Sequence, residues 1–173
     1  KKIKKPLISF GSEDKQNKCI KVVYSDICPE YRYMLLDNVN SKLKTPKYIK
    51  DKLIKSDITP VNLIVDVSNY VMMELGQPTH AFDKDTISGK LSIKINNKKN
   101  TFIGIDNKEY IVEKGKPVIV DEDHNIHALP GVLGSKISAV TNTTKNILFE
   151  SAFFVPDIVR RLSRDFRIQP DSS

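Results

Sequence analysis

The chain has no tryptophan and only two cysteines among its 173 residues. Cys19 and Cys28 have no companion pair at metal-ligand spacing, so neither a zinc site nor a disulfide framework is indicated. No apolar run reaches the ~18 residues that cross a bilayer, and the lysine-rich start precedes too few apolar residues for a secretion signal. These absences predict a cytoplasmic protein with no membrane segment.

The sequence also lacks the usual signatures of nucleophilic and phosphate-binding enzymes. There is no G-x-S-x-G motif, and neither cysteine has a histidine nearby in sequence. The segment from Gly131 to Lys136 lacks the Lys-Ser/Thr ending of a phosphate loop. His124 and His127 stand beside acidic residues, but a solvated turn is a better interpretation than a metal site because no ordered ligand scaffold is visible.

Composition predicts one domain that can enclose a single core, preceded by a polar lead at residues 1–18. A net charge of +7 and a pI near 9.3 are compatible with a nucleic-acid partner. The lysines are scattered along the whole chain, however, so a biased composition explains the charge equally well.

The densest concentration of unusual residues is the stretch 60–83, PVNLIVDVSNYVMMELGQPTHAFD. Its length and apolar content predict a fully buried helix with Asn62 as N-cap, closed by Gly76 and Pro78. One stripe would contain Ile64, Val67, Val71 and Leu75. Polar residues three and four apart can meet on such a helix, here Asp66, Asn69 and Tyr70.

Elsewhere the pattern predicts short strands and two further helices. One helix would start with Thr45 as N-cap before Pro46 and end by Asp57, and a basic one would cover residues 156–166. A turn at residues 28–31 would separate the first two strands, and residues 91–95 and 101–105 would form a hairpin through the turn between them. The expected strands are residues 20–24, 33–39, 91–95, 101–105, 110–112, 118–120 and 146–152. Helices and antiparallel strands in separate blocks predict an α+β fold.

Two polar residues stand out among apolar neighbours. Glu150 lies inside an apolar strand, where it must either find a partner or face a cavity. His80 follows Gln-Pro-Thr and is open to either a structural or a functional role.

Three motifs in order carry a resemblance: VDVSNYVMMELGQPTHAFD, then ALPGVLGSKISAV, then NILFESAFF before a proline and an Arg-rich helix. Over residues 19–173 the chain resembles the B3/B4 editing domain of bacterial-type phenylalanyl-tRNA synthetase beta subunits. The resemblance implies an α+β domain with antiparallel sheets and flanking helices. Because family chains continue past the final Asp-Ser-Ser, it also implies a fragment of a longer subunit.

The resemblance implies hydrolysis of tyrosine wrongly attached to phenylalanine tRNA. At family positions, Glu150 would read the tyrosine hydroxyl, His80 would be the catalytic residue that orients substrate or water, and Asn69 would form the pocket wall. Gly131 and Gly134 would let the backbone approach the ester. The domain itself would need no metal or cofactor, whereas ATP and Mg²⁺ would serve the complete synthetase. The implied partners are phenylalanine tRNA, tyrosine and a synthetase alpha subunit in an alpha2-beta2 tetramer.

Three departures from the family pattern leave alternatives open. Thr59 replaces a common Arg, Ser135 replaces a Gly, and Pro170 replaces a Thr whose hydroxyl would lie near the ester. The same domain could therefore be an editing-deficient scaffold that docks tRNA, and a free-standing deacylase is a third interpretation. The arginines of the last helix, Arg160, Arg161, Arg164 and Arg167, could face the tRNA backbone or simply water.

Overall fold

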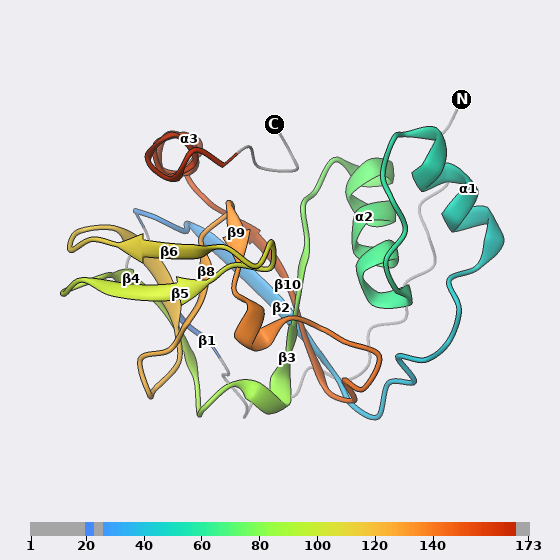
Figure 1. The fold of residues 1–173 in the computed structure, drawn as a ribbon, viewed down its shortest axis with the longest axis horizontal. Coiled ribbons are helices and arrows are strands. Elements are labelled where there is room, and N and C mark those ends of the chain that lie inside the picture. The colour runs from blue at the N-terminus through green and yellow to red at the C-terminus, as the bar shows by residue number, and fades with distance from the viewer. Residues whose placement is uncertain (1–19, 23–25, 169–173) are drawn as a thin grey trace.

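A computed structural model describes residues 20–22 and 26–168 of the chain. The predicted lead at residues 1–18, Cys19 and Pro170 lie outside the described residues. The α+β prediction is confirmed, with three α-helices and two short 3₁₀ helices in the described residues. Figure 1 shows α1 and α2 side by side at one end of the molecule and α3 towards the other. Their bounds are α1 Lys47–Lys55, α2 Leu63–Leu75, η1 Lys84–Thr86, η2 Lys136–Ser138 and α3 Pro156–Phe166.

The largest sheet has five strands in the order β1-β4-β7-β8-β9. Its neighbours are antiparallel except β1 and β4, which run parallel. The strands are β1 Ile20–Val22, β4 Leu91–Ile95, β7 Pro117–Val120, β8 Ile126–Leu129 and β9 Leu133–Gly134.

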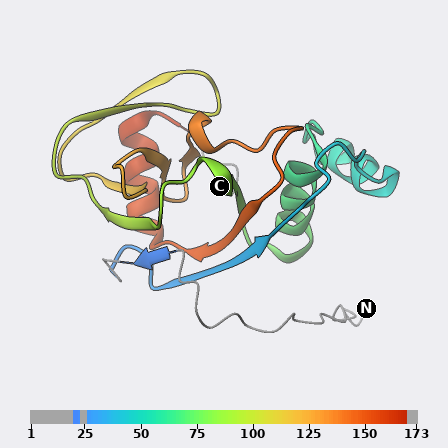
Figure 2. The same cartoon turned by 90° about the horizontal axis from the view of Figure 1, so that it is seen from below.

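A second, three-stranded sheet has β10 at its centre, antiparallel to β2 on one side and to β3 on the other. Strands β5 and β6 form a separate two-stranded ribbon. Seen from below, β2 and β10 run as a long pair towards the α1–α2 end (Figure 2). The strands are β2 Glu30–Leu36, β3 His80–Asp83, β5 Asn100–Ile103, β6 Glu109–Val112 and β10 Ile147–Phe153.

The predicted strand positions are largely right, but two predicted connections are wrong. Residues 30 and 31 belong to β2 rather than to the turn before it. Strands β4 and β5 form no hairpin, since β4 pairs with β7 and β5 pairs with β6. The buried amide of Asn96 explains this: it donates to the carbonyls of Lys98 and Val112, at 2.5 and 3.0 Å, and so fastens the end of β4 to β6.

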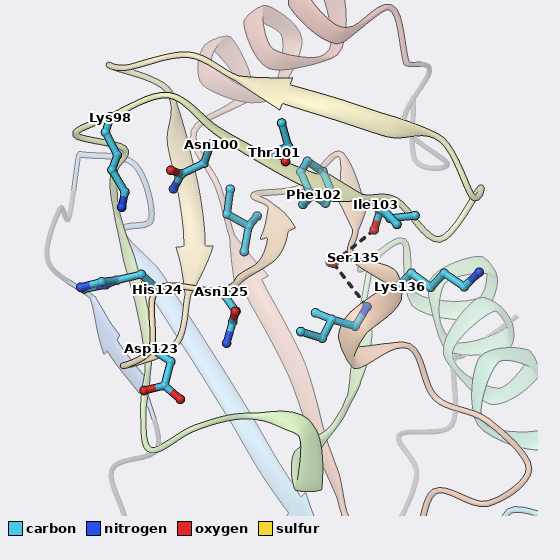
Figure 3. Close-up of a pocket in the computed structure, with 12 residues that line it drawn as sticks. Lys98, Asn100, Thr101, Phe102, Ile103, Asp123, His124, Asn125, Ser135 and Lys136 are labelled. Atoms are coloured by element: carbon cyan, nitrogen blue, oxygen red, sulfur yellow. Dashed lines mark hydrogen bonds between the residues drawn. The ribbon is translucent and has the colours of Figure 1, made fainter.

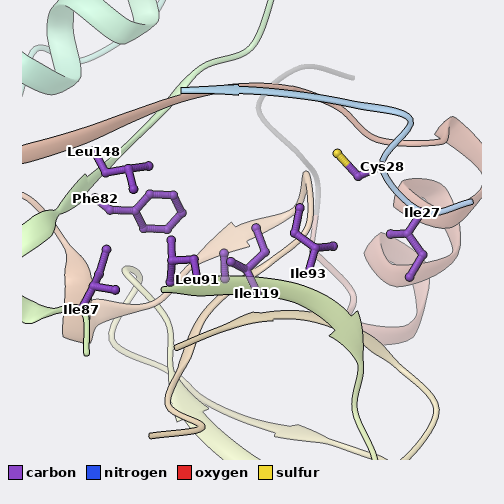
Figure 4. Close-up of a cluster of buried hydrophobic side chains, with 9 residues drawn as sticks. Ile27, Cys28, Phe82, Ile87, Leu91, Ile93, Ile119 and Leu148 are labelled. Carbon is purple, nitrogen blue, oxygen red and sulfur yellow. The ribbon is translucent and has the colours of Figure 1, made fainter. Parts of the chain in front are cut away.

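The main core lies between the three-stranded and five-stranded sheets. Phe82 and Leu148 project from the smaller sheet onto Leu91, Ile93 and Ile119 of the larger one (Figure 4). All five side chains are at most 1% exposed. A second cluster, built around Phe102 and Val112 of the ribbon, packs on β7 and β8. The inner face of the smaller sheet therefore lies against the buried core between the two sheets.

Helix α2 begins and ends as predicted. The Asn62 side chain accepts hydrogen bonds from the amides of Ile64 and Val65, at 3.1 and 3.0 Å, and Gly76 closes the helix in the left-handed conformation. The prediction of a fully buried helix is wrong, because Leu75 is 66% exposed and only Ile64, Asp66 and Ser68 are buried. The helix packs on α1 and β3, leaving much of its apolar surface uncovered.

The polar contacts of α1 and α2 also differ from prediction. Thr45 is not the N-cap of α1; that position is Pro46 and carries no side-chain cap. The Thr45 hydroxyl instead donates to a carboxylate oxygen of Asp66, whose other oxygen accepts from the Val61 amide at 2.7 Å. Asp66 therefore joins the two helices rather than meeting Asn69 and Tyr70. Across the part of the chain that is described, no helix combines the length and apolarity needed to cross a membrane.

Candidate functional site

Strand pairing brings together the two polar residues that the sequence singled out. On β10, Glu150 lies directly opposite Tyr33 of β2 and His80 of β3. Opposed residues of antiparallel strands point to the same face, and the neighbouring pair Leu148 and Phe82 lies in the core between the sheets. Glu150 and His80 therefore project together towards the five-stranded sheet.

Glu150 is an acid held in a nearly dry environment. It is 6% exposed, and the Tyr31 hydroxyl donates a hydrogen bond to its Oε2 atom. Burial raises the pKa of Glu150 to about 7, although the hydrogen bond from Tyr31 works in the opposite direction. Burial and the charge of Glu150 also raise the pKa of the neighbouring Cys28 thiol to about 11. The Glu150 carboxyl is thus poised between its neutral and ionised forms near neutral pH.

His80 is held by packing rather than by hydrogen bonds. Its ring stands edge-on to Phe82, with the ring centroids 4.4 Å apart. A methyl group at Gly134 would lie 2.7 Å from His80 Cε1, so only glycine allows the imidazole this close to β9. Burial lowers the pKa of His80 to about 4, and no hydrogen bond to its ring nitrogens occurs among the described residues. The ring is therefore neutral at pH 7 and keeps a nitrogen available to accept a proton.

The other predicted site residues are placed less centrally. Gly131 sits in the turn between β8 and β9 with a φ of +68°, where a side chain would meet Val159 of α3 at 2.9 Å. Asn69 follows Ser68 on α2, and the Ser68 hydroxyl donates to the carbonyl of Thr79 at 2.8 Å. This bond holds α2 beside the residue that precedes His80. No hydrogen bond joins the Asn69 side chain to His80 or Glu150.

A cavity of about 560 Å³ lies beside the ribbon, and neither His80 nor Glu150 lines it (Figure 3). Its wall includes Ser135, whose hydroxyl donates to the carbonyl of Ile103 at 3.2 Å and accepts from the Ile137 amide. Adjacent residues of extended chain point to opposite sides, so Gly134 faces His80 while Ser135 faces this cavity. The charged groups around the cavity are exposed, unlike Glu150, so we place the candidate site at the His80–Glu150 pair.

His127 corrects a sequence prediction. His124 is exposed, as expected of a solvated turn, but His127 is fully buried in β8. Its Nε2 atom lies 3.1 Å from a carboxylate oxygen of the buried Asp121, which also accepts from the Asn125 amide at 2.8 Å. The pair secures the β7–β8 turn. No group of three His, Cys, Asp or Glu side chains in the described residues could hold a metal ion.

Tyr31 is the partner of Glu150 that sequence reasoning missed. The sequence pattern predicts a turn at this residue, whereas the structure places it on the inner face of β2. A signal was available, because the segment from Glu30 to Leu36 alternates between outward residues and the inward Tyr31, Tyr33 and Leu35.

The fold, in which an antiparallel sheet packs on a mixed sheet with a buried acid beside a neutral histidine, agrees with a family assignment. The B3/4 domain model matches residues 27–173, so the chain belongs to the B3/4 domain family. It is 38% identical over 148 residues to the phenylalanine-tRNA ligase beta subunit of Psychrobacter arcticus, covering 86% of this chain and 18% of that protein. It is 39% identical over 138 residues to the same subunit of Wolbachia sp. subsp. Brugia malayi, covering 80% and 17% respectively.

A solved structure supports the fold independently. The chain superimposes on a crystal structure of an N-terminal fragment of the phenylalanyl-tRNA synthetase beta subunit from Pyrococcus horikoshii with a TM-score of 0.55. The match covers 81% of this chain and 45% of that one at 16% identity, which supports the fold alone. The chain spans about a fifth of the length of the curated relatives that it matches.

Proposed function

We propose that this domain removes tyrosine from phenylalanine tRNA, as an editing site within a phenylalanine-tRNA ligase beta subunit. The observation that carries the proposal is the buried Glu150 carboxyl on β10, which lies directly opposite a neutral His80 on the neighbouring strand β3. Glu150 would recognise the substrate, and His80 would assist the attack of water.

Recognition follows from the cost of leaving a buried polar group unpaired. Tyrosine and phenylalanine differ by one hydroxyl, which a hydrophobic synthetic pocket rejects only about a hundredfold. A site that presents a buried carboxyl would invert this preference, since phenylalanine brings no donor for the Glu150 oxygen that Tyr31 does not bind. Sites built to bind a hydroxyl discriminate by roughly 10⁴-fold or more against the analogue that lacks it.

Hydrolysis requires little more than an oriented water molecule, because an aminoacyl ester is already activated. His80 would accept a proton or a hydrogen bond from that water through its free ring nitrogen. Water would attack the ester carbonyl, the bond to the tRNA ribose would break, and free tyrosine and a tRNA hydroxyl would result. The close packing of Gly134 on His80 would fix the ring in position.

The remaining predicted roles are part of the same proposal. Asn69 would contribute to the pocket wall, and Gly131 would shape the turn that carries β9 towards the ester. The complete protein would be cytoplasmic and would pair with an alpha subunit in an alpha2-beta2 tetramer. Its ATP and Mg²⁺ would serve the synthetic reaction outside this domain.

The test is deacylation of tyrosine-charged phenylalanine tRNA by the complete two-subunit enzyme, compared with phenylalanine-charged tRNA. Wild type should release tyrosine rapidly and spare phenylalanine. Glu150→Ala should lose the discrimination, and His80→Ala should slow release of tyrosine by at least about 100-fold. Aminoacylation by the same preparations controls for folding.

If wild type releases tyrosine no faster than spontaneous hydrolysis, the editing proposal fails. The domain would then be the alternative, an editing-deficient scaffold that docks tRNA. The side chain of Ser135 at a position that is Gly in the family pattern is the feature that makes this outcome worth distinguishing.

A further inference from the structure

The side chain of Tyr31 is a phenol that contacts Glu150, the acid that is proposed to recognise the phenol of the bound tyrosine. It lies on the inner face of β2, opposite Ala152, which is two residues beyond Glu150 on β10. From there its hydroxyl donates to Oε2 of Glu150. The contact joins the two strands across 119 sequence positions and is made on the same face as His80.

The chemistry of this contact fixes the direction of the hydrogen bond. Burial and the neighbouring Glu150 charge raise the pKa of Tyr31 far above its usual value, so the phenol keeps its proton and acts as the donor. In turn, the bond lowers the pKa of Glu150 and opposes the effect of burial. Tyr31 therefore holds one oxygen of the carboxyl and favours its ionised form.

The other carboxylate oxygen is left available. In the described residues, the only sealed side-chain nitrogen or oxygen atoms without a partner are His127 Nδ1 and Ser138 Oγ. Oε1 of Glu150 accepts no hydrogen bond from a described residue and is not one of these atoms. It is therefore not fully closed off from solvent. A carboxylate can accept a donor at each oxygen, so Oε1 can receive a second phenol while Oε2 holds Tyr31.

We infer that Tyr31 is a positioning residue for substrate selection, which anchors Oε2 of Glu150 and thereby presents Oε1 to the hydroxyl of the bound tyrosine. The inference rests on the proposed editing function. It assigns to Tyr31 an effect on selectivity that a merely structural tyrosine would not have.

The variant that tests this is Tyr31→Phe in the complete two-subunit enzyme, because it removes one hydroxyl and keeps the ring. The ratio of kcat/KM for tyrosine-charged over phenylalanine-charged tRNA should fall at least about tenfold, mainly through a higher KM for the tyrosine substrate. The apparent pKa attributed to Glu150 in the pH profile should rise. Tyr110→Phe is the matched control, because Tyr110 donates to Asp106 at 2.7 Å on the ribbon, away from Glu150.

The outcomes separate this inference from the proposed function. A wild-type preference for tyrosine that is lost in Glu150→Gln but unchanged in Tyr31→Phe would overturn the role of Tyr31 alone. Faster tyrosine release by Tyr31→Phe would also overturn it, since Tyr31 would then be a competitor for Glu150. No preference in wild type would remove the proposed function and this inference with it. A fall in selectivity confined to Tyr31→Phe, with Tyr110→Phe unchanged, supports it.

Discussion

Glu150 and His80 are neighbours whose pKa values are displaced in opposite directions by the same cause. Burial disfavours charge, so it raises the pKa of the acid to about 7 and lowers that of the imidazole to about 4. The groups that face Glu150 are Cys28, Tyr31 and Tyr33 from the β2 side and His80 from β3. Near neutral pH the site therefore combines a neutral base with a carboxyl that can exchange its proton.

The two groups predict opposite pH dependences of stability. Glu150 holds a proton in the folded state that the unfolded chain loses above pH 4.5, so the free energy of unfolding falls as pH rises from 4.5 to about 7. In the folded state His80 stays unprotonated at pH values below 6.5, where the unfolded chain gains a proton. The free energy of unfolding therefore falls as pH drops from 6.5 to about 4. Each effect is worth roughly 3 kcal/mol, and in wild type they largely oppose each other.

Denaturant unfolding across this pH range separates them. Relative to wild type, Glu150→Gln should become more stable as pH rises from 4.5 to 7, because only the His80 effect remains. His80→Gln should show the reverse slope. Parallel curves for wild type and both variants would mean that neither pKa is displaced as described.

Single residues were predictable where their chemistry conflicts with their surroundings. Glu150 in an apolar strand and His80 after Gln-Pro-Thr stood out in the sequence, and the Asn62 cap was predicted correctly. Tyr31 and His127 were not, because tyrosine and histidine suit both surface and interior. Only the folded structure shows that their polar atoms meet Glu150 and Asp121.

At the scale of elements, the joint between α1 and α2 depends on Asp66. This carboxylate is 1% exposed and accepts from the Thr45 hydroxyl before α1 and from the Val61 amide before α2. It thus fixes the position of α2, which is held next to β3 by the Ser68–Thr79 bonds. A displacement of α2 at this joint would therefore also move Thr79, the residue before His80.

Replacing Asp66 with alanine should lower the free energy of unfolding by roughly 2–4 kcal/mol, because a hydroxyl and an amide would lose their acceptor inside the protein. Equilibrium unfolding in urea measures the change. Asp51→Ala is the matched control, since Asp51 is exposed on α1 and should cost under about 0.5 kcal/mol. Equal losses in the two variants would contradict the role of Asp66.

Elements with local signals were the most predictable. Helix α3 was placed correctly because a proline starts it and an amphipathic pattern continues, and β4 was placed correctly because its residues alternate. Strand β3 was missed because its four residues follow a helix closely and are too few to show a pattern. The burial of α2 was overestimated, since apolar content does not reveal which face has a neighbour.

At the scale of the whole molecule, the candidate site is assembled by pairing between distant segments. The central strand β10 joins β2, which lies more than a hundred residues earlier, to β3, so His80 and Glu150 meet only in the assembled sheet. Local patterns carry no information about such pairing, which is why a β4–β5 hairpin was wrongly expected. The family resemblance implies roles for His80 and Glu150, and the sheet register shows that these two residues lie opposite each other.

The central claim is that Glu150 recognises a hydroxyl, and a substrate series tests it most directly. Deacylation by the complete enzyme would be measured on phenylalanine tRNA charged with tyrosine, phenylalanine or 4-fluorophenylalanine, whose fluorine fills space without donating a hydrogen bond. We expect rapid release of tyrosine alone by wild type and no distinction among the three by Glu150→Ala. Release of 4-fluorophenylalanine as fast as tyrosine by wild type would show that the site selects size, and would contradict the role assigned to Glu150.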